Sequence, residues 1–175
     1  FKNLPIETLE NKNPVQVNQY SLRTDSGGAG CYRGGLGVVR DYEILARNAD
    51  LSLWFERTLT PQWGLFGGKS GTVPLVVLEP GTDRERELLK VNHMPVTLGL
   101  KFSASTGGGG GYGHPWERYV EHVINDVMDD YVSKAAAVRS YGVVFNDDSL
   151  DVDEDATKIA RASLESKEAV SPVND

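Results

Sequence analysis

The chain has 175 residues, a net charge of −7 and an isoelectric point near 5.0, and this acidic balance argues against nucleic acid or an anionic membrane as its main partner. Charged residues make up 25% and apolar residues 39% of the sequence, which is typical of a globular protein and excludes a disordered one. No apolar run reaches the roughly 18 residues that a membrane span needs. The single cysteine, Cys31, cannot form an internal disulfide, which favours a reducing, cytoplasmic location.

The chain up to about residue 105 is expected to consist mainly of β-strands. Alternating or continuous apolar, β-branched and aromatic residues recur in short segments separated by glycine-rich turns. These segments are 15–22, 36–45, 51–57, 73–78 and 94–105. No internal repeat is evident, so the strands predict one β-rich region.

The part from about 115 to 167 changes to a helical period. Apolar residues recur every three or four positions from Trp116 to Tyr131, Ser133 can cap a second helix, and Gly142 can end it. The segment 142–145 is expected to be a strand, and Asp151 with Glu154 resembles a capping box before a last helix. The pattern predicts an α+β fold in a single domain, 1–167, followed by a flexible tail, 168–175.

Five consecutive glycines, Gly107 to Gly111, stand directly before the first predicted helix. They are not a Walker-type loop, because His114 and Pro115 follow the last glycine of the segment instead of Lys and Ser or Thr. A second cluster, 28–34, precedes a strand pattern and not the helix that a dinucleotide site requires. Two readings stay open for the five glycines: their amides bind an anion, or they allow backbone segments to approach closely.

No complete catalytic or metal-binding set is visible. His93, His114 and His122 have no metal-ligand spacing, so no metal is expected in this chain. His122 is expected to form a solvated pair with Asp126, four residues later on the polar side of the helix. His114 adjoins the glycine segment and is the one candidate for an acid–base role, although a capping or plain loop position is the alternative.

Taken together, three long segments resemble the hydantoinase B family. They are "YSLRTDSGGAGCYRGGLGVVRDYEIL", "ERTLTPQWGLFGGKSG" and "TGGGGGYGHPWERYVEHVINDVMDDYVSKAAAVRSYGVVF", and they occur in the family's order. This family includes subunits of N-methylhydantoinases and 5-oxoprolinases and is related to subunits of acetone and acetophenone carboxylases. The resemblance covers nearly the whole chain, from about residue 5 to 161.

The resemblance implies partners and cofactors that lie outside this chain. ATP and Mg²⁺ are expected on a hydantoinase A-type subunit, which phosphorylates an oxygen of the substrate. The B-type part then assists ring-opening hydrolysis of a cyclic amide, or carboxylation of a ketone enolate. Backbone amides of Gly107, Gly108, Gly109, Gly110, Gly111 and Tyr112 are the candidates for contact with the intermediate.

The resemblance also implies that this chain is not active alone. It matches only the C-terminal portion of typical B subunits, which are several times longer, so the rest of the B-type subunit is an expected partner. Relatives often carry Asp where this sequence has His114, which leaves the acid–base role open. The alternative function is a non-catalytic assembly module, which exposed Trp54, Trp63 or Trp116 would favour.

Overall fold

A computed structural model describes residues 3–146 and 149–170. The contacts within these residues divide the chain into two compact units. The strand unit consists of residues 3–23, 37–60 and 73–107. The glycine–helix unit consists of residues 24–36, 61–72, 108–146 and 149–170. The chain passes between the two units several times.

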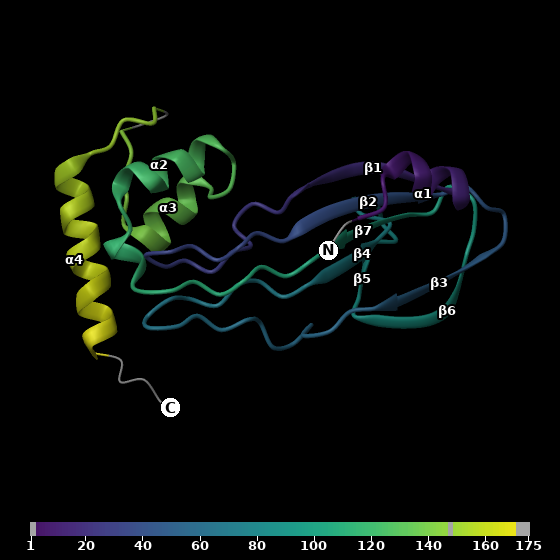
Figure 1. Cartoon of the computed structure of the whole chain (residues 1–175), viewed down its shortest axis with the longest axis horizontal. Coiled ribbons are helices and arrows are strands. Elements are labelled where there is room, and N and C mark those ends of the chain that lie inside the picture. Colours follow the sequence, from purple (N-terminus) through teal and green to yellow (C-terminus); the bar gives the residue numbers. More distant parts are fainter. Residues whose placement is uncertain (1–2, 147–148, 171–175) are drawn as a thin grey trace. The chain divides into compact units, whose positions relative to one another are not determined.

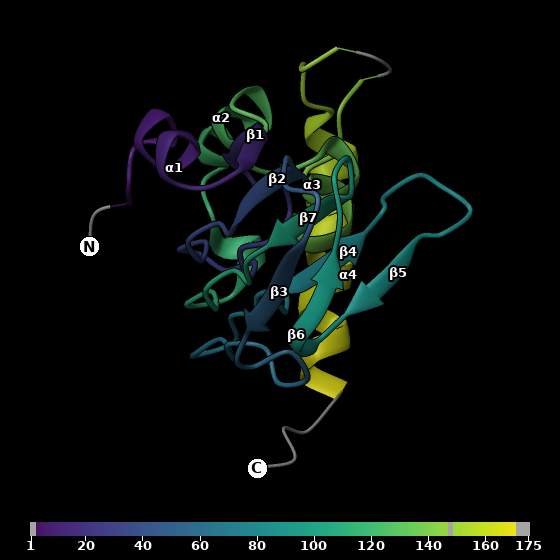
Figure 2. The same cartoon turned by 90° about the vertical axis from the view of Figure 1, so that its right-hand side faces the viewer.

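The strand unit contains an antiparallel sheet of five strands in the order β1-β2-β7-β4-β5 (Figure 1). Its strands are β1 (Val15–Leu22), β2 (Val38–Ile44), β7 (Lys101–Ser105), β4 (Leu75–Leu78) and β5 (Arg86–Leu88). A separate antiparallel pair, visible beside the sheet in Figure 2, is formed by β3 (Ala49–Trp54) and β6 (Lys90–Val96). The short helix α1 (Ile6–Lys12) precedes β1.

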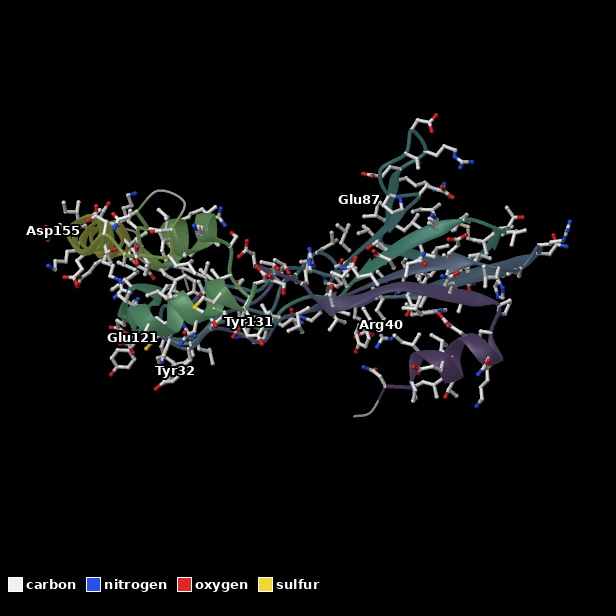
Figure 3. The ribbon with its side chains drawn as sticks, turned by 90° about the horizontal axis from the view of Figure 1, so that it is seen from above. Tyr32, Arg40, Glu87, Glu121, Tyr131 and Asp155 are labelled. Carbon is white, nitrogen blue, oxygen red and sulfur yellow. The ribbon has the colours of Figure 1, made fainter. Side chains whose placement is uncertain are left out.

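The core of the strand unit draws on the sheet and on the β3–β6 pair. Val76 is 1% exposed and Phe102 stacks on Tyr42 with ring centroids 4.9 Å apart. Leu53 of β3 and Val96 of β6 belong to the same buried cluster. On the sheet, the Arg40 guanidinium lies 4.2 Å from the centre of the Tyr20 ring, on the side that carries α1 (Figure 3).

The glycine–helix unit contains a short 3₁₀ helix and three α-helices. They are η1 (Pro115–Glu117), α2 (Val120–Met128), α3 (Lys134–Tyr141) and α4 (Glu154–Val170). The buried core of the unit comes from α2, α3 and the segments that follow them, and it is formed by Val123, Val132, Ala136, Ala137, Tyr141 and Val143. No helix in the described ranges is long and apolar enough to cross a membrane.

The caps of α3 are those that the sequence predicts. The Ser133 hydroxyl oxygen accepts a hydrogen bond from the Ala136 amide, 3.1 Å away, and Gly142 ends the helix with a positive φ of 64°. The cap of α4 differs from the prediction, because the carboxylate of Asp153, and not of Asp151, accepts a hydrogen bond from the Ala156 amide at 2.9 Å. A carboxylate three residues before the amide that it caps fits this role.

The fold class, α+β with strands before helices, is confirmed, and five of the strands and the three long helical segments lie where the sequence predicts them. The 94–105 segment is two strands, since Gly99 turns the chain with φ +83°. The predicted strand at 142–145 is wrong, because only Phe145 forms a bridge, with Val152. Helix α4 continues to Val170, past the expected boundary at 167, and residues 171–175 of the expected tail lie outside the described residues.

Candidate functional site

Three glycine-rich segments, 27–35, 64–71 and 108–113, meet backbone to backbone in the glycine–helix unit, and we call them the glycine body. The Gly28 amide donates to the Gly109 carbonyl at 2.8 Å, and the Gly109 amide donates to the Gly35 carbonyl at 2.9 Å. The Gly111 amide donates to the Lys69 carbonyl at 2.9 Å. The five-glycine segment therefore lies against both of the other segments and is hydrogen bonded to each.

The close approach of these segments explains why they are glycine. A Cβ atom at Gly34 would lie 2.1 Å from the Gly109 carbonyl oxygen, and one at Gly68 would lie 2.1 Å from that of Gly111. Gly34 and Gly68 do not have a positive φ, so left-handed backbone is not the reason for glycine at either position. The missing side chain is required because another backbone occupies its place.

The expected anion-binding amides are largely engaged within the glycine body. Gly108 donates to the Thr72 carbonyl at 3.1 Å, and Gly109 and Gly111 donate as described above. Gly107 lies in the strand unit. Among the described residues, the amides of Gly107 and Gly110 have no acceptor. Contact with an anion is therefore open to the amides of Gly107 and Gly110, and Gly110 is the one of the two that belongs to the glycine–helix unit.

Tyr112 forms the centre of an exposed aromatic patch, which we define as Tyr32, Leu65, Phe66 and Tyr112. The Tyr112 amide donates to the Tyr32 carbonyl at 2.9 Å, and its ring lies 6.2 Å from the ring of Tyr32 and 5.1 Å from that of Phe66. Tyr32, labelled in Figure 3, is 69% exposed and Phe66 is 73% exposed. Contiguous exposed rings on a rigid backbone are typical of a contact surface.

His114 lies beside the glycine body in a cluster with Trp116, Lys69 and Glu168. Its imidazole stacks on the Trp116 ring at 4.5 Å, and its Nδ1 lies 3.8 Å from Oε1 of Glu168. Nδ1 is buried and has no hydrogen-bond partner among the described residues. The other oxygen of Glu168, Oε2, accepts from Nζ of Lys69 at 2.6 Å. Gly67 leaves room for the imidazole, because a Cβ at this position would lie 2.2 Å from Nδ1 of His114.

A buried ionic triad joins the glycine body to the helices. Oδ2 of Asp126 accepts from Nε of Arg33 at 3.2 Å and from Arg118 at 2.9 Å. The Arg118 guanidinium also donates to the Cys31 carbonyl at 3.0 Å. Burial makes the loss of any one partner costly, since the remaining charge would be left uncompensated away from water.

The expected solvated pair of His122 and Asp126 is therefore wrong. Asp126 is only 7% exposed and faces the two arginines, whereas the His122 ring contacts Tyr119 edge-on at 5.4 Å. Asp126 was assigned to the solvent-facing side of the helix because Tyr119 was counted as part of the buried apolar face. Tyr119 is in fact 74% exposed. Two cations from distant parts of the sequence compensate the buried carboxylate.

Comparison with known protein families shows to which family the chain belongs. A family model described as hydantoinase B/oxoprolinase matches residues 1–115, well over half of the chain. The chain belongs to this family. Its fold and its glycine body are consequently features of a hydantoinase B/oxoprolinase protein.

Relatives of this hydantoinase B/oxoprolinase chain include enzymes of named activity. The chain is 35% identical over 167 residues to the caprolactamase subunit beta of Pseudomonas jessenii, a match that covers 90% of this chain and 28% of that protein. The structure of the ATP-dependent caprolactamase from the same organism is similar with a TM-score of 0.75 and 32% identity over 90% of this chain and 28% of that one.

An acetone carboxylase, described as ATP-dependent and nucleotide-free, shares the fold with a TM-score of 0.76. The sequence identity is 21%, and the match covers 98% of this chain and 27% of the carboxylase chain. The hydantoinase B/oxoprolinase chain thus spans little more than a quarter of the length of these relatives.

Sequence reasoning identified His114 but missed the residues that surround it. Lys69 and Glu168 are 99 positions apart in the hydantoinase B/oxoprolinase chain, so no local spacing signals their pairing. The triad was missed for the same reason, since Arg33 and Asp126 are 93 positions apart. In residues 3–146 and 149–170, no three His, Cys, Asp or Glu side chains are grouped so that they could hold a metal ion.

Proposed function

We propose that this chain is one part of an ATP-dependent, hetero-oligomeric enzyme that opens cyclic amides, and that it acts in the cytoplasm. The observation that carries the proposal is the 35% identity to a caprolactamase subunit beta over 90% of the chain. The partners are an A-type subunit, which holds ATP and Mg²⁺, and the remaining B-type part. This chain alone is not expected to turn over substrate.

Phosphorylation explains why such an enzyme requires ATP. An amide oxygen is a poor leaving group, and transfer of a phosphoryl group to that oxygen activates the ring carbon for attack by water. The phosphorylated intermediate must be kept from side reactions until the attacking group is in place. In this proposal the amide of Gly110, which has no acceptor among the described residues, and the imidazole of His114 are this chain's candidates for contact with the intermediate.

Cyclic-amide hydrolysis is favoured over carboxylation. The caprolactamase structure is 32% identical to this chain, whereas the acetone carboxylase structure is 21% identical and supports the fold alone. Both relatives are described as ATP-dependent, so the proposed activation by ATP is compatible with either reaction.

A non-catalytic assembly module is the second candidate, and specific observations favour it. Three of the five glycine amides already donate to carbonyls inside the glycine body. Trp54 is 72% and Trp63 is 66% exposed, as a surface that contacts partners would require, whereas Trp116 is partly buried. In this role the chain would support the site without touching substrate.

Co-purification and reconstitution test the proposal. A tagged copy of the chain is expected to recover an A-type and a larger B-type polypeptide from its native cells. The complex should release ADP together with a ring-opened product from caprolactam, hydantoin or 5-oxoproline, and omission of the chain should abolish that coupled activity. Recovery of the chain alone, as a stable monomer, would contradict the proposal.

The variant His114→Gln separates the two candidates. In complexes that assemble normally, a catalytic role predicts that kcat falls at least about tenfold, since general acid–base groups contribute roughly 10²–10⁴-fold. The assembly-module candidate predicts an unchanged kcat in the same complexes. Gly110→Ala would not discriminate, because its Cβ would lie 2.0 Å from the Trp63 carbonyl oxygen and would disturb packing.

A further inference from the structure

A recess of about 420 Å³ opens beside the His114 cluster in the glycine–helix unit. Residues from the glycine body, η1, α3 and α4 line it, among them Lys69, Trp116, Arg139, Leu164, Lys167 and Glu168. This volume lies within the roughly 300–1,000 Å³ of sites that hold small molecules. The recess is therefore large enough for a compact organic ligand.

The charged side chains around the recess are mainly positive, whereas the net charge of the whole chain is negative. Three cations, Lys69, Arg139 and Lys167, and one carboxylate, Glu168, line it in a protein with a net charge of −7. The negative charges elsewhere on the surface repel an anion, so an anion binds where positively charged side chains are grouped. The recess offers such a group.

Lys69 differs from the other two cations in having a partner among the described residues. Lys69 is held by Glu168 at 2.6 Å, and the same carboxylate lies near His114. Arg139 and Lys167 have no hydrogen-bond or ion-pair partner among residues 3–146 and 149–170. Both side chains are thus available to an oxyanion, which a guanidinium can bind through two parallel hydrogen bonds.

The remaining wall of the recess is largely apolar, with Ser140 as its polar residue. Trp116, which is fixed by its stack with His114, and Leu164 of α4 both line it. An inorganic ion would gain nothing from these side chains, whereas a short hydrocarbon body would be removed from water against them. The wall and the cations together select a ligand with an anionic end and an apolar body.

We propose that this recess binds a small organic oxyanion, a carboxylate or a phosphate monoester carried on a short hydrocarbon body. This site adds a ligand class to the proposed function, and it rests on that function for the reaction that supplies the ligand. Opening of a lactam releases a carboxylate on a hydrocarbon chain, and phosphorylation of the amide oxygen gives an imidoyl phosphate, which a phosphate monoester resembles in its charged oxygens. Arg139 and Lys167 bind the oxyanion, and Trp116 and Leu164 contact the apolar body.

Calorimetric titration of the full 175-residue chain tests the proposal without any partner. The probes are 6-aminohexanoate, butyl phosphate and inorganic phosphate. We expect at least one of the two organic probes to bind more tightly than inorganic phosphate. Tighter binding of 6-aminohexanoate would support a product as the source, and tighter binding of butyl phosphate would support a phosphorylated intermediate.

The double variant Arg139→Gln/Lys167→Gln should weaken binding of the organic probe at least about tenfold, because two charge-assisted hydrogen bonds are lost. The matched control is Lys158→Gln on α4, an exposed cation that pairs with Asp155 outside the recess and should leave binding unchanged. Each single variant should give a smaller loss. All replaced side chains are exposed, so the fold, checked by circular dichroism, should persist.

Two results would overturn the proposal: no binding of either organic probe at millimolar concentration, or an equal loss in the double variant and in Lys158→Gln. The second result would mean that only overall charge attracts the probes. Failure here is distinguishable from failure of the proposed function. The recess can be empty of ligand in a chain that still joins an active complex, and it can bind the probes in a chain that recovers no partner.

Discussion

At the scale of single residues, Asp126 contributes more to the glycine–helix unit than its place on a short helix suggests. Its carboxylate receives hydrogen bonds from Arg33 and Arg118, which are 16% and 12% exposed. The Arg118 carbonyl in turn accepts from the Arg161 guanidinium at 2.8 Å. One carboxylate therefore connects the glycine body, η1, α2 and, through Arg118, α4.

Replacing this carboxylate should destabilise the protein strongly. We expect Asp126→Asn to lower the free energy of unfolding by about 3–5 kcal/mol, because the two arginines would remain buried without their anion. Urea denaturation followed by circular dichroism measures the change. Asp129→Asn, an exposed carboxylate in the same segment, is the control and should change stability by less than about 0.5 kcal/mol. Equal effects of the two variants would show that the triad contributes no stability.

The buried hydroxyl of Tyr141 is expected to make the folded state less stable at alkaline pH. It is 2% exposed, and burial raises the pKa of its hydroxyl from 10.0 to about 12. Above pH 10 the unfolded state gives up this proton while the folded state keeps it, so the folded state binds more protons and stability falls as pH rises. Its contribution is complete below pH 10 and is lost between pH 10 and about 12.

The variant Tyr141→Phe should remove this dependence. Between pH 10 and 12, its stability should fall by about 2–3 kcal/mol less than that of the wild-type chain, since one pKa unit corresponds to about 1.4 kcal/mol. Urea denaturation at a series of pH values measures the difference. Tyr112→Phe, at a 49% exposed position, should keep the wild-type slope. Parallel curves for the wild type and Tyr141→Phe would contradict the assignment.

At the scale of elements, the glycine body is held by contacts that only the absence of side chains permits. Gly34 and Gly35 give a matched test, because they are adjacent and neither has a positive φ. A Cβ at Gly34 would meet the Gly109 carbonyl, whereas a Cβ at Gly35 would have nothing within 4 Å. The two positions differ in the space around them.

We therefore expect Gly34→Ala to destabilise the chain by at least about 2 kcal/mol. The added methyl group would force apart the backbone at Gly34 and the backbone at Gly109. Gly35→Ala should be neutral or should stabilise by up to about 1 kcal/mol, since alanine restricts the unfolded chain. Thermal unfolding of the two variants gives the comparison. If Gly35→Ala were as harmful as Gly34→Ala, chain flexibility and not close packing would explain the glycines.

Elements with strong local signals could be predicted from the sequence, and those formed by distant contacts could not. Ser133 and Gly142 define α3 because a cap acts within one turn. Helix α1 was not predicted, because it has only seven residues and none of them is buried. Strand β5 was missed because it has three residues and pairs only with β4.

The candidate site follows the same rule. The glycine segment and His114 stand out in one stretch of sequence, so both could be named in advance. Lys69, Arg139 and Glu168 are brought near them only by folding, and nothing in the sequence around Arg139 and Glu168 distinguishes these two from solvated charges. Pairing of backbone amides across the glycine body could not be predicted either, because it depends on which segments come together.

At the scale of the whole molecule, the proposed function requires partners, and the chain spans 28% of the length of the caprolactamase subunit that it matches. The aromatic patch is the surface of the glycine–helix unit that we expect the remaining B-type part to cover. The Tyr112 ring contacts the rings of Tyr32 and Phe66, and the hydrogen-bonded glycine segments hold the three residues in place. Little conformational entropy is lost when such a patch binds.

The variant Phe66→Asn should weaken association of the chain with the B-type partner by at least about tenfold, since central aromatic residues contribute about 2 kcal/mol or more to interfaces. Asparagine suits this position because Phe66 has a φ of 51°, which asparagine tolerates well. Leu59→Asn, at an 82% exposed position of the strand unit, is the control and should bind as the wild type does. Biolayer interferometry with the co-purified partner measures both dissociation constants. If Phe66→Asn bound normally while Leu59→Asn did not, the partner would contact the strand unit and the aromatic patch would be free for another role.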